Sequence, residues 1–161
     1  MTKTTLRPMK AVLQRVASAS VTVDNIVRAQ TAPDKRGLLV LAGLEDTDEP
    51  ADLQWMAEKI VHIRIFPDDA GKMNLSVLDV GGTIILVPNF TLAGDAVKGR
   101  RPSFDRAMKP ERSEGEFERF VSHVRALAPD VQTGVFRAHM EVRLLNDGPV
   151  TMLLDSALRS R

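Results

Sequence analysis

The amino-acid sequence predicts an α+β fold, in which two or three helices pack on a curved mixed β-sheet or a small barrel. Many short segments carry strand patterns, only two carry clear helical patterns, and the two kinds do not alternate as in a doubly wound nucleotide-binding fold. The length of 161 residues is typical of one domain. We expect a single domain over residues 9–161, preceded by a flexible leader over residues 1–8, which lack apolar periodicity.

Four strands and one helix are predicted in the first part of the chain. Residues 9–16 and 19–23 have strand patterns that a short turn separates, and residues 37–44 form the continuous apolar run of a strand buried on both faces. Residues 61–66 alternate between apolar and polar side chains and predict a further strand. A helix is expected to begin at Pro50, because apolar residues then recur every three or four positions, at Leu53, Met56, Ala57 and Ile60.

The second part of the chain predicts a strand, a loop, a helix and a hairpin. Residues 83–87 are rich in β-branched side chains and form the strand, whereas residues 94–109 are polar and without pattern, as in a surface loop. Residues 110–127 predict the clearest helix, with one apolar stripe and a proline at its start. Residues 140–144 and 150–154 predict the two strands of a hairpin, which turns at residues 146–149.

Composition excludes several classes of protein. The chain has no cysteine, which excludes a thiol nucleophile, a disulfide framework and thiolate metal ligands. Its 22 Lys and Arg against 21 Asp and Glu give a net charge of +1, which argues against a uniformly basic protein that coats nucleic acid. Because the chain lacks both an apolar run of membrane-spanning length and a signal-peptide core, we expect a cytoplasmic protein that spans no membrane.

Familiar catalytic and cofactor motifs are missing from the sequence. His62, His123 and His139 lie far apart and form no i, i+4 pair of a helical zinc site. The Gly81-Gly82 pair precedes a strand, whereas a phosphate-binding loop follows a strand and opens a helix. We therefore expect neither a metal nor a cofactor.

Two segments have a composition that is unusual for plain scaffold. Pro88-Asn89-Phe90-Thr91-Leu92 follows an apolar strand with an amide, an aromatic ring and a hydroxyl, at a point where backbone N–H groups can face a cleft. Asn146-Asp147-Gly148-Pro149 joins two strand patterns. An ordinary polar turn at a strand end explains the first segment equally well, and a hairpin turn explains the second.

A basic cluster lies in the predicted loop. Lys98, Arg100 and Arg101 stand close together, and Arg106, Lys109 and Arg112 follow. A solvated loop and a phosphate-binding rim both account for this charge, so the cluster alone does not distinguish them.

Several motifs, in order, resemble those of the D-aminoacyl-tRNA deacylases, the D-tyrosyl-tRNA deacylase family. The similarity spans Met9 to about Asp155. The motif Asn-x-Gly-Pro-x-Thr is matched without change at residues 146–151. The other matching segments are Lys10–Val16, His62–Phe66, Gly71–Leu75, Arg101–Phe104 and Gln132–Gly134.

One signature departs from the family. Its usual Ser-Gln-Phe-Thr-Leu is here Pro88-Asn89-Phe90-Thr91-Leu92, so a hydroxyl is lost and the amide stands on a shorter stem. A sister family with Pro-Gln-Ala-Thr-Leu at this position removes misplaced L-alanine from tRNA. That activity is one alternative function, and a non-catalytic nucleic-acid-binding module is another.

The resemblance implies an enzyme that hydrolyses the ester bond of D-aminoacyl-tRNA, D-tyrosyl-tRNA among others and glycyl-tRNA as a further candidate. The products are free D-amino acid and tRNA, which makes the reaction a proofreading step of translation. The resemblance also implies a homodimer, in which a cis Gly148-Pro149 turn enters the partner's pocket as a chiral filter that leaves no room for an L side chain. The mechanism that the resemblance implies is attack by water, assisted by the 2′-hydroxyl of tRNA, which needs no catalytic side chain as a base. We expect the reaction to be independent of metal.

The resemblance assigns further residues to the site. Backbone N–H groups of Phe90 and Thr91 stabilise the oxyanion, and Arg15 braces the incoming Gly-Pro turn through carbonyl groups. The remaining pocket residues are Pro88, Asn89 and Leu92, and the residues expected to bind tRNA are Lys98, Arg100 and Arg101.

Overall fold

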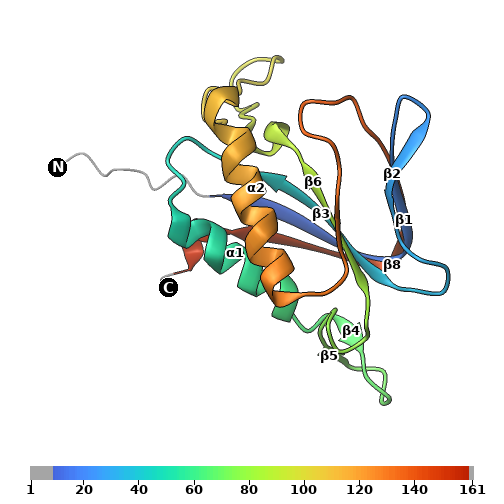
Figure 1. Ribbon diagram of the computed structural model, residues 1–161. Coiled ribbons are helices and arrows are strands. Elements are labelled where there is room, and N and C mark those ends of the chain that lie inside the picture. Colours follow the sequence, from blue (N-terminus) through green and yellow to red (C-terminus); the bar gives the residue numbers. More distant parts are fainter. Residues whose placement is uncertain (1–8, 160–161) are drawn as a thin grey trace.

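A computed structural model describes residues 9–159 of the protein (Figure 1). Helices α1 (Pro50–His62) and α2 (Pro110–Leu127) pack side by side against one face of a mixed six-stranded sheet. This arrangement confirms the predicted α+β class and the two predicted helices. The leader predicted at residues 1–8 lies outside the described residues. Among residues 9–159, no helix has the length and apolar character that a membrane crossing needs.

The sheet has strand order β2-β1-β3-β6-β7. β2 and β3 pair with successive parts of one edge of β1, and β8 pairs with its opposite edge. The pairs β3–β6 and β6–β7 are parallel, and the pairs that β1 makes are antiparallel. Two short strands form a separate small sheet, and two 3₁₀ turns follow β6 and β8. The bounds are β1 Lys10–Val23, β2 Ile26–Gln30, β3 Gly37–Gly43, β4 Phe66–Pro67, β5 Met73–Leu75, β6 Thr83–Pro88, η1 Phe90–Ala93, β7 Val131–Thr133, β8 Glu141–Asp155 and η2 Ser156–Leu158.

A side-chain amide links the two ends of this strand order. Gln132 of β7 donates to the carbonyl of Gln30 in β2 at 2.8 Å, and its own side-chain oxygen accepts the Gln30 N–H at 2.9 Å. These two bonds imitate a strand pair between β2 and β7. The sheet therefore curls into a nearly closed barrel, as the sequence predicts.

Two apolar clusters bury opposite faces of the central strands. The larger cluster lies between the sheet and the helices and contains Leu38 and Ile84. The smaller one lies within the curl of the sheet and contains their neighbours Leu39 and Ile85. Because β3 and β6 supply both clusters, they need apolar side chains at every position, which confirms the burial predicted for residues 37–44.

The predicted hairpin of residues 140–154 is wrong. β8 runs without reversal, and both of its halves pair antiparallel with β1. Between the halves the register jumps, since Thr151 pairs with Gln14 whereas Asn146 pairs with Val16. Residues 147–150 therefore loop out of one long strand.

The predicted break between residues 16 and 19 is also wrong, because β1 is continuous over 14 residues. Its register against β8 shifts between Val16 and Ser18, so the feature that resembles a turn in the sequence is an irregularity within one strand.

Two further predictions need correction, and three short strands were not predicted. Val61 and His62 belong to the last turn of α1, where Val61 packs into the larger cluster, and little of the strand predicted over residues 61–66 remains. The predicted surface loop ends in Ala107 and Met108, which are buried. The short strands β2, β5 and β7 carry too few apolar positions for the sequence pattern to reveal them.

Gly43 permits the close approach of η1 to β3. A Cβ atom at this position would lie 2.7 Å from Cβ of Leu92 and 3.0 Å from the carbonyl oxygen of Asn89. We expect Gly43→Ala to lower the free energy of unfolding by about 1–3 kcal/mol, because backbone and a fixed side chain would have to move. Thermal or urea denaturation measures this change.

The matched control is Gly115→Ala. Gly115 lies within α2, and a Cβ atom there meets nothing within 4 Å. This control should gain about 0.5–1 kcal/mol, because alanine is the better helix former. Equal effects of the two substitutions would contradict the role of Gly43.

Candidate active site

A cleft of about 850 Å³ opens beside the carboxyl ends of the parallel strands β3 and β6. Pro88, Asn89 and Phe90 line it where β6 ends. Side chains from residues 104–113, ahead of and within the start of α2, form a second wall, and side chains from residues 136–140, ahead of β8, form a third. The carboxyl ends of parallel strands are the usual site of ligand binding in sheets of this kind.

The side chain of Asn89 organises the start of η1. Its Oδ1 accepts the Thr91 hydroxyl at 2.5 Å and the Thr91 N–H at 3.3 Å, while the Asn89 N–H continues the ladder to the carbonyl of Ala42 at 2.8 Å. No acceptor for the N–H of Phe90 is found among residues 9–159. This N–H is one of the donors that the first turn of a helix leaves unpaired.

Phe90 and Phe104 form an aromatic pair at the mouth of the cleft. Their ring centroids lie 5.2 Å apart at an interplanar angle of 73°, the edge-to-face geometry that aromatic pairs prefer. Phe90 nevertheless keeps 60% of its surface exposed. A large ring left open beside a cleft is a surface on which a flat ligand can stack.

The third wall, residues 136–140, is attached to β6 through the residues that precede it. The N–H of Gly134 donates to the carbonyl of Leu86 at 2.9 Å, and the sulfur of Met140 accepts the N–H of Val135 at 3.4 Å. A Cβ atom on Gly134 would lie 2.6 Å from that sulfur. Glycine therefore allows Met140 to fold back against the wall.

The loop at residues 146–151 is closed by its own motif residues. Asn146 Oδ1 accepts the N–H of Val150 at 2.8 Å, and its Nδ2 donates to the hydroxyl of Thr151 at 3.1 Å. Gly148 has φ of 134°, a conformation that favours glycine, and the Gly148-Pro149 peptide bond is cis, as the resemblance implies. Asn146 and Thr151 are thus positioning residues that the motif contains but that sequence reasoning did not assign to the site.

Arg15 fixes this loop through contacts with Asp147. Its Nε donates to the carbonyl of Asp147 at 3.1 Å and lies 3.4 Å from the Asp147 carboxylate, and its Nη1 donates to the carbonyl of Ile65 at 2.7 Å. The side chain is almost fully buried. Arg15 thus contacts carbonyl groups of its own chain. Contact between Arg15 and the incoming turn of a partner subunit, which the resemblance implies, stays a prediction.

Within one chain, the predicted site residues fall into separate places. Pro88, Asn89 and Phe90 line the cleft, whereas Thr91 and Leu92, in η1, are not among the lining residues. Arg15 and the exposed pair Gly148-Pro149 lie on β1 and β8, and neither lines the cleft.

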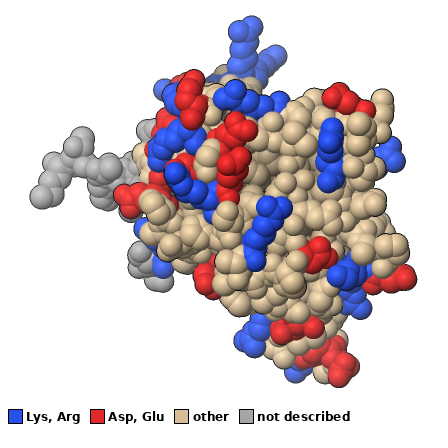
Figure 2. Space-filling view, viewed as in Figure 1, with Lys and Arg blue, Asp and Glu red and all other residues tan. Residues whose placement is uncertain are grey.

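The predicted basic cluster divides into two groups. Arg106 lies 3.4 Å from the carboxylate of Asp95, and Arg112 donates to the carbonyls of Asp46 and Asp48, so both stabilise the fold. The second group, Lys98, Arg100 and Arg101, is exposed in a loop that an Asp95–Ser103 bridge closes. Figure 2 shows basic side chains projecting where Figure 1 places the loop between η1 and α2.

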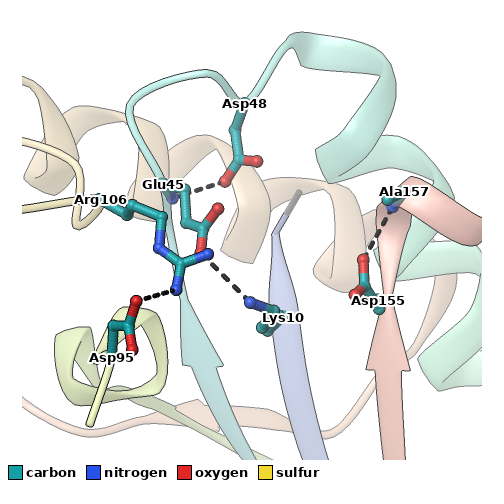
Figure 3. A network of polar contacts seen from close by, with 7 residues as sticks. All are labelled: Lys10, Glu45, Asp48, Asp95, Arg106, Asp155 and Ala157. Carbon is teal, nitrogen blue, oxygen red and sulfur yellow. Dashed lines mark hydrogen bonds and ion pairs between the residues drawn. The ribbon is translucent and has the colours of Figure 1, made fainter. Parts of the chain in front are cut away.

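A buried polar network supports the wall that precedes α2 (Figure 3). Glu45 is 1% exposed and pairs with Lys10 at 3.4 Å, while its N–H donates to Asp48 at 2.8 Å. The segment that contains Glu45 and Asp48 is joined to this wall by backbone hydrogen bonds. In one of them the N–H of Met108 donates to the carbonyl of Leu44. The network therefore couples buried carboxylates to a segment that lines the cleft.

The carboxyl group of Asp48 is the most perturbed group of this network. Burial raises its pKa to about 7, and the nearby carboxylates of Asp52 and Glu45 add to this shift, while the hydrogen bond from the Glu45 N–H opposes it. Sequence reasoning missed this group, because nothing in the pattern of residues 45–52 shows that the segment is buried.

Conventional catalytic groups do not converge on the cleft. Across residues 9–159, no three His, Asp or Glu side chains are arranged to hold a metal ion. His62 pairs with Glu58, one helical turn away in α1. The cleft offers instead the main-chain N–H of Phe90, the amide of Asn89, the hydroxyl of Ser113 and four phenylalanine rings.

Solved structures identify the class of this fold. A structure titled "Structural Analysis of a probable eukaryotic D-amino acid tRNA deacylase" superposes with a TM-score of 0.75 at 20% identity, covering 91% of this chain and 98% of that one. A second, titled "c-Myc DNA Unwinding Element Binding Protein", has a TM-score of 0.84 at 38% identity and covers 90% and 97%. The chain thus has the fold of a D-amino acid tRNA deacylase.

Sequence comparison then gives the family. The family model described as D-Tyr-tRNA(Tyr) deacylase matches residues 12–155. D-aminoacyl-tRNA deacylases of Pelobacter propionicus and Geobacter sulfurreducens are 52% and 51% identical, covering 91% and 94% of this chain and 99% and 98% of those proteins. The chain belongs to the D-Tyr-tRNA(Tyr) deacylase family, which confirms the resemblance seen in its motifs.

The raised pKa of Asp48 predicts a pH-dependent stability. The folded state keeps this proton up to about pH 7, whereas the ordinary pKa of an aspartate is 3.8, so the stabilisation is complete below about pH 4 and is lost as the pH rises to about 7. Asp48→Asn, which mimics the protonated form, should therefore raise the melting temperature more at pH 8 than at pH 5.

Asp79→Asn is the control, because the Asp79 pKa is shifted in the opposite direction. Hydrogen bonds from the N–H and the hydroxyl of Ser76 lower its pKa, so its stabilising effect is complete above about pH 4. The decrease in melting temperature that Asp79→Asn causes should therefore be the same at pH 5 and pH 8. A gain for Asp48→Asn that is independent of pH would contradict the assignment of a raised pKa.

Proposed function

We propose that this protein hydrolyses the ester bond of D-aminoacyl-tRNA by polarising the ester carbonyl with main-chain N–H groups. The observation that carries the proposal is the unpaired N–H of Phe90 at the mouth of the cleft, in a chain of the deacylase family. The products are free D-amino acid and tRNA. The protein is a hydrolase that acts on tRNA and removes wrongly attached residues.

The reaction requires stabilisation of an oxyanion. Water attacks the acyl carbon, its oxygen forms the new bond, and the carbonyl oxygen becomes negatively charged. The N–H of Phe90 donates to this oxygen, and the N–H of Thr91, held by Asn89 only at 3.3 Å, is the second donor. The carbonyl then re-forms and the bond to the ribose oxygen breaks. The 2′-hydroxyl relays to this oxygen the proton that the water loses, so the tRNA leaves with both hydroxyls intact.

The hydroxyl of Thr91 does not act as a nucleophile in this proposal. It is bound to the amide oxygen of Asn89 at 2.5 Å, and an amide cannot remove its proton. The role of Thr91 is therefore to hold the turn together with Asn89. Pro88 and Leu92 complete the pocket, since Pro88 lines the cleft and Leu92 packs beneath η1 against β3.

A second copy of the chain supplies the chiral filter. The edge strand β8 pairs with β1 alone among the described strands, and it carries Leu145 and Leu153, which are 61% and 78% exposed. An open strand edge with exposed leucines favours a two-fold contact with another copy. Such a contact brings the exposed Gly148-Pro149 loop of one subunit to the cleft of the other, where its rigid backbone excludes an L side chain.

Lys98, Arg100 and Arg101 bind the tRNA backbone. Their loop follows η1 directly, so a tRNA whose 3′ end enters the cleft passes over it. Cations that no acid neutralises attract phosphates at low ionic strength, and this attraction weakens as salt is added.

The substrate assay tests the proposal. Release of amino acid from D-tyrosyl-, L-tyrosyl-, L-alanyl- and glycyl-tRNA is compared under one set of conditions. We expect fast release of D-tyrosine and none of L-tyrosine. Preference for L-alanyl-tRNA would support the sister activity, and tRNA binding without any hydrolysis would support a nucleic-acid-binding module.

Thr91→Val should keep most of the turnover, because the substitution removes the hydroxyl but keeps the main-chain N–H. The rate of D-tyrosyl-tRNA hydrolysis should fall by less than about tenfold. Thr91→Ser is the control for changed packing of the side chain. An acyl ester trapped on Thr91 of the unchanged protein would contradict attack by water.

Gly148→Val should abolish hydrolysis of D-tyrosyl-tRNA. A Cβ atom at this position would lie 2.9 Å from Val150 Cγ2, and the larger side chain would fill the partner's cleft. The control is Gly81→Val, which also has a positive φ of 64° but open space around it and no place in the site. Equal activity of the two variants would remove Gly148 from the filter.

A further inference from the structure

Arg137 occupies a backbone conformation that its side chain does not favour. The N–H of Ala138 donates to the carbonyl of Val135 at 3.2 Å and closes a turn, in which Arg137 is the third residue with φ of 64°. Glycine or asparagine is the usual residue at a turn position with positive φ, because a larger side chain crowds its own backbone. Local folding therefore gives no reason for arginine here.

The side chain of Arg137 lies along the wall of the cleft. Its guanidinium stands 5.8 Å from the ring centroid of Phe136, whose ring lies 6.4 Å from that of Phe117 in α2. Stacking on an anchored ring restricts where the guanidinium can go. No hydrogen bond or ion pair of this guanidinium is found among residues 9–159.

A second wall of the cleft also carries a cation. Lys109, at the start of α2, lines the same cleft and is exposed, and its side chain makes no ion pair within residues 9–159. Glu111 is the single acidic side chain among the lining residues. The lining therefore has two cations, on two of its walls, against one carboxylate, a balance that favours an anionic ligand.

We propose that Arg137 binds a phosphate of the tRNA 3′ end and so positions the ester against η1. The proposal rests on the proposed function, because the ligand is the tRNA that carries the ester. A planar guanidinium donates two parallel hydrogen bonds to a phosphate, which fixes direction as well as distance. Contacts to phosphate set the register of a nucleic acid without reading its sequence. Lys109 supplies a second charge from the other wall.

The experiment compares two substrates that differ in phosphate. D-tyrosyl-tRNA has phosphates, and D-tyrosyl-adenosine has the same ester but none. Arg137→Gly and Arg137→Asn both remove the charge and suit a positive φ, so neither should lower the melting temperature by more than a few degrees. Arg28→Gln, which removes one exposed cation on β2, is the matched control.

Both Arg137 variants should raise KM for D-tyrosyl-tRNA about tenfold at unchanged kcat, with hydrolysis of D-tyrosyl-adenosine unaltered. The binding of uncharged tRNA, measured by fluorescence anisotropy, should lose about 0.7 from its salt slope, the value for one phosphate of a single strand. The control should change none of these quantities.

Three outcomes would overturn the proposal: an unchanged KM and salt slope, an equal loss with both substrates, or the same loss in Arg28→Gln. An equal loss would show that Arg137 shapes the cleft and does not contact phosphate. Failure of the unchanged protein to hydrolyse either substrate would overturn the proposed function instead, and the salt slope of tRNA binding would still decide the role of Arg137.

Discussion

The pairing of β1 with β8 is the constraint on which the rest of the structure depends. β1 holds β8 along one edge and both β3 and β2 along the other, so its register fixes both sides of the molecule. On one edge, the register jump beyond Gln14 expels the loop that contains Gly148. On the other edge, pairing with β3 places Gly43 where η1 can approach it. One strand thus positions both the loop and the cleft.

The two edges use different forces to hold their functional segments. Beside β8, Arg15 and Asn146 satisfy the carbonyl and N–H groups that the interrupted ladder leaves without partners. Beside β3, Glu45 and Asp48 keep carboxylates out of water, which is costly unless each finds a donor or a proton. Burial raises the pKa of the Asp48 carboxyl to about 7, so this second arrangement changes its charge near neutrality. The support of the cleft wall therefore depends on pH.

Sequence reasoning predicted the elements with strong patterns and failed where long-range pairing decides the structure. The helix over residues 110–127 and the apolar strands of residues 37–44 and 83–87 follow from local periodicity. The turn residues of the loop at 146–149 look the same in a hairpin as in a bulge, and only their partner β1 distinguishes the two. The motif match indicated Phe90 as a candidate site residue, but the positive φ of Arg137 cannot be predicted from the sequence pattern.

The departure at Pro88-Asn89 follows from a site built on main chain. Proline lacks an N–H, but Pro88 is the last residue of β6, and the ladder continues from the N–H of Asn89 to the carbonyl of Ala42. The shorter amide of Asn89 still reaches the hydroxyl of Thr91. Neither change removes the N–H of Phe90, which is the donor that the proposed mechanism requires. A site whose donors belong to the backbone can therefore change these side chains and keep its reaction.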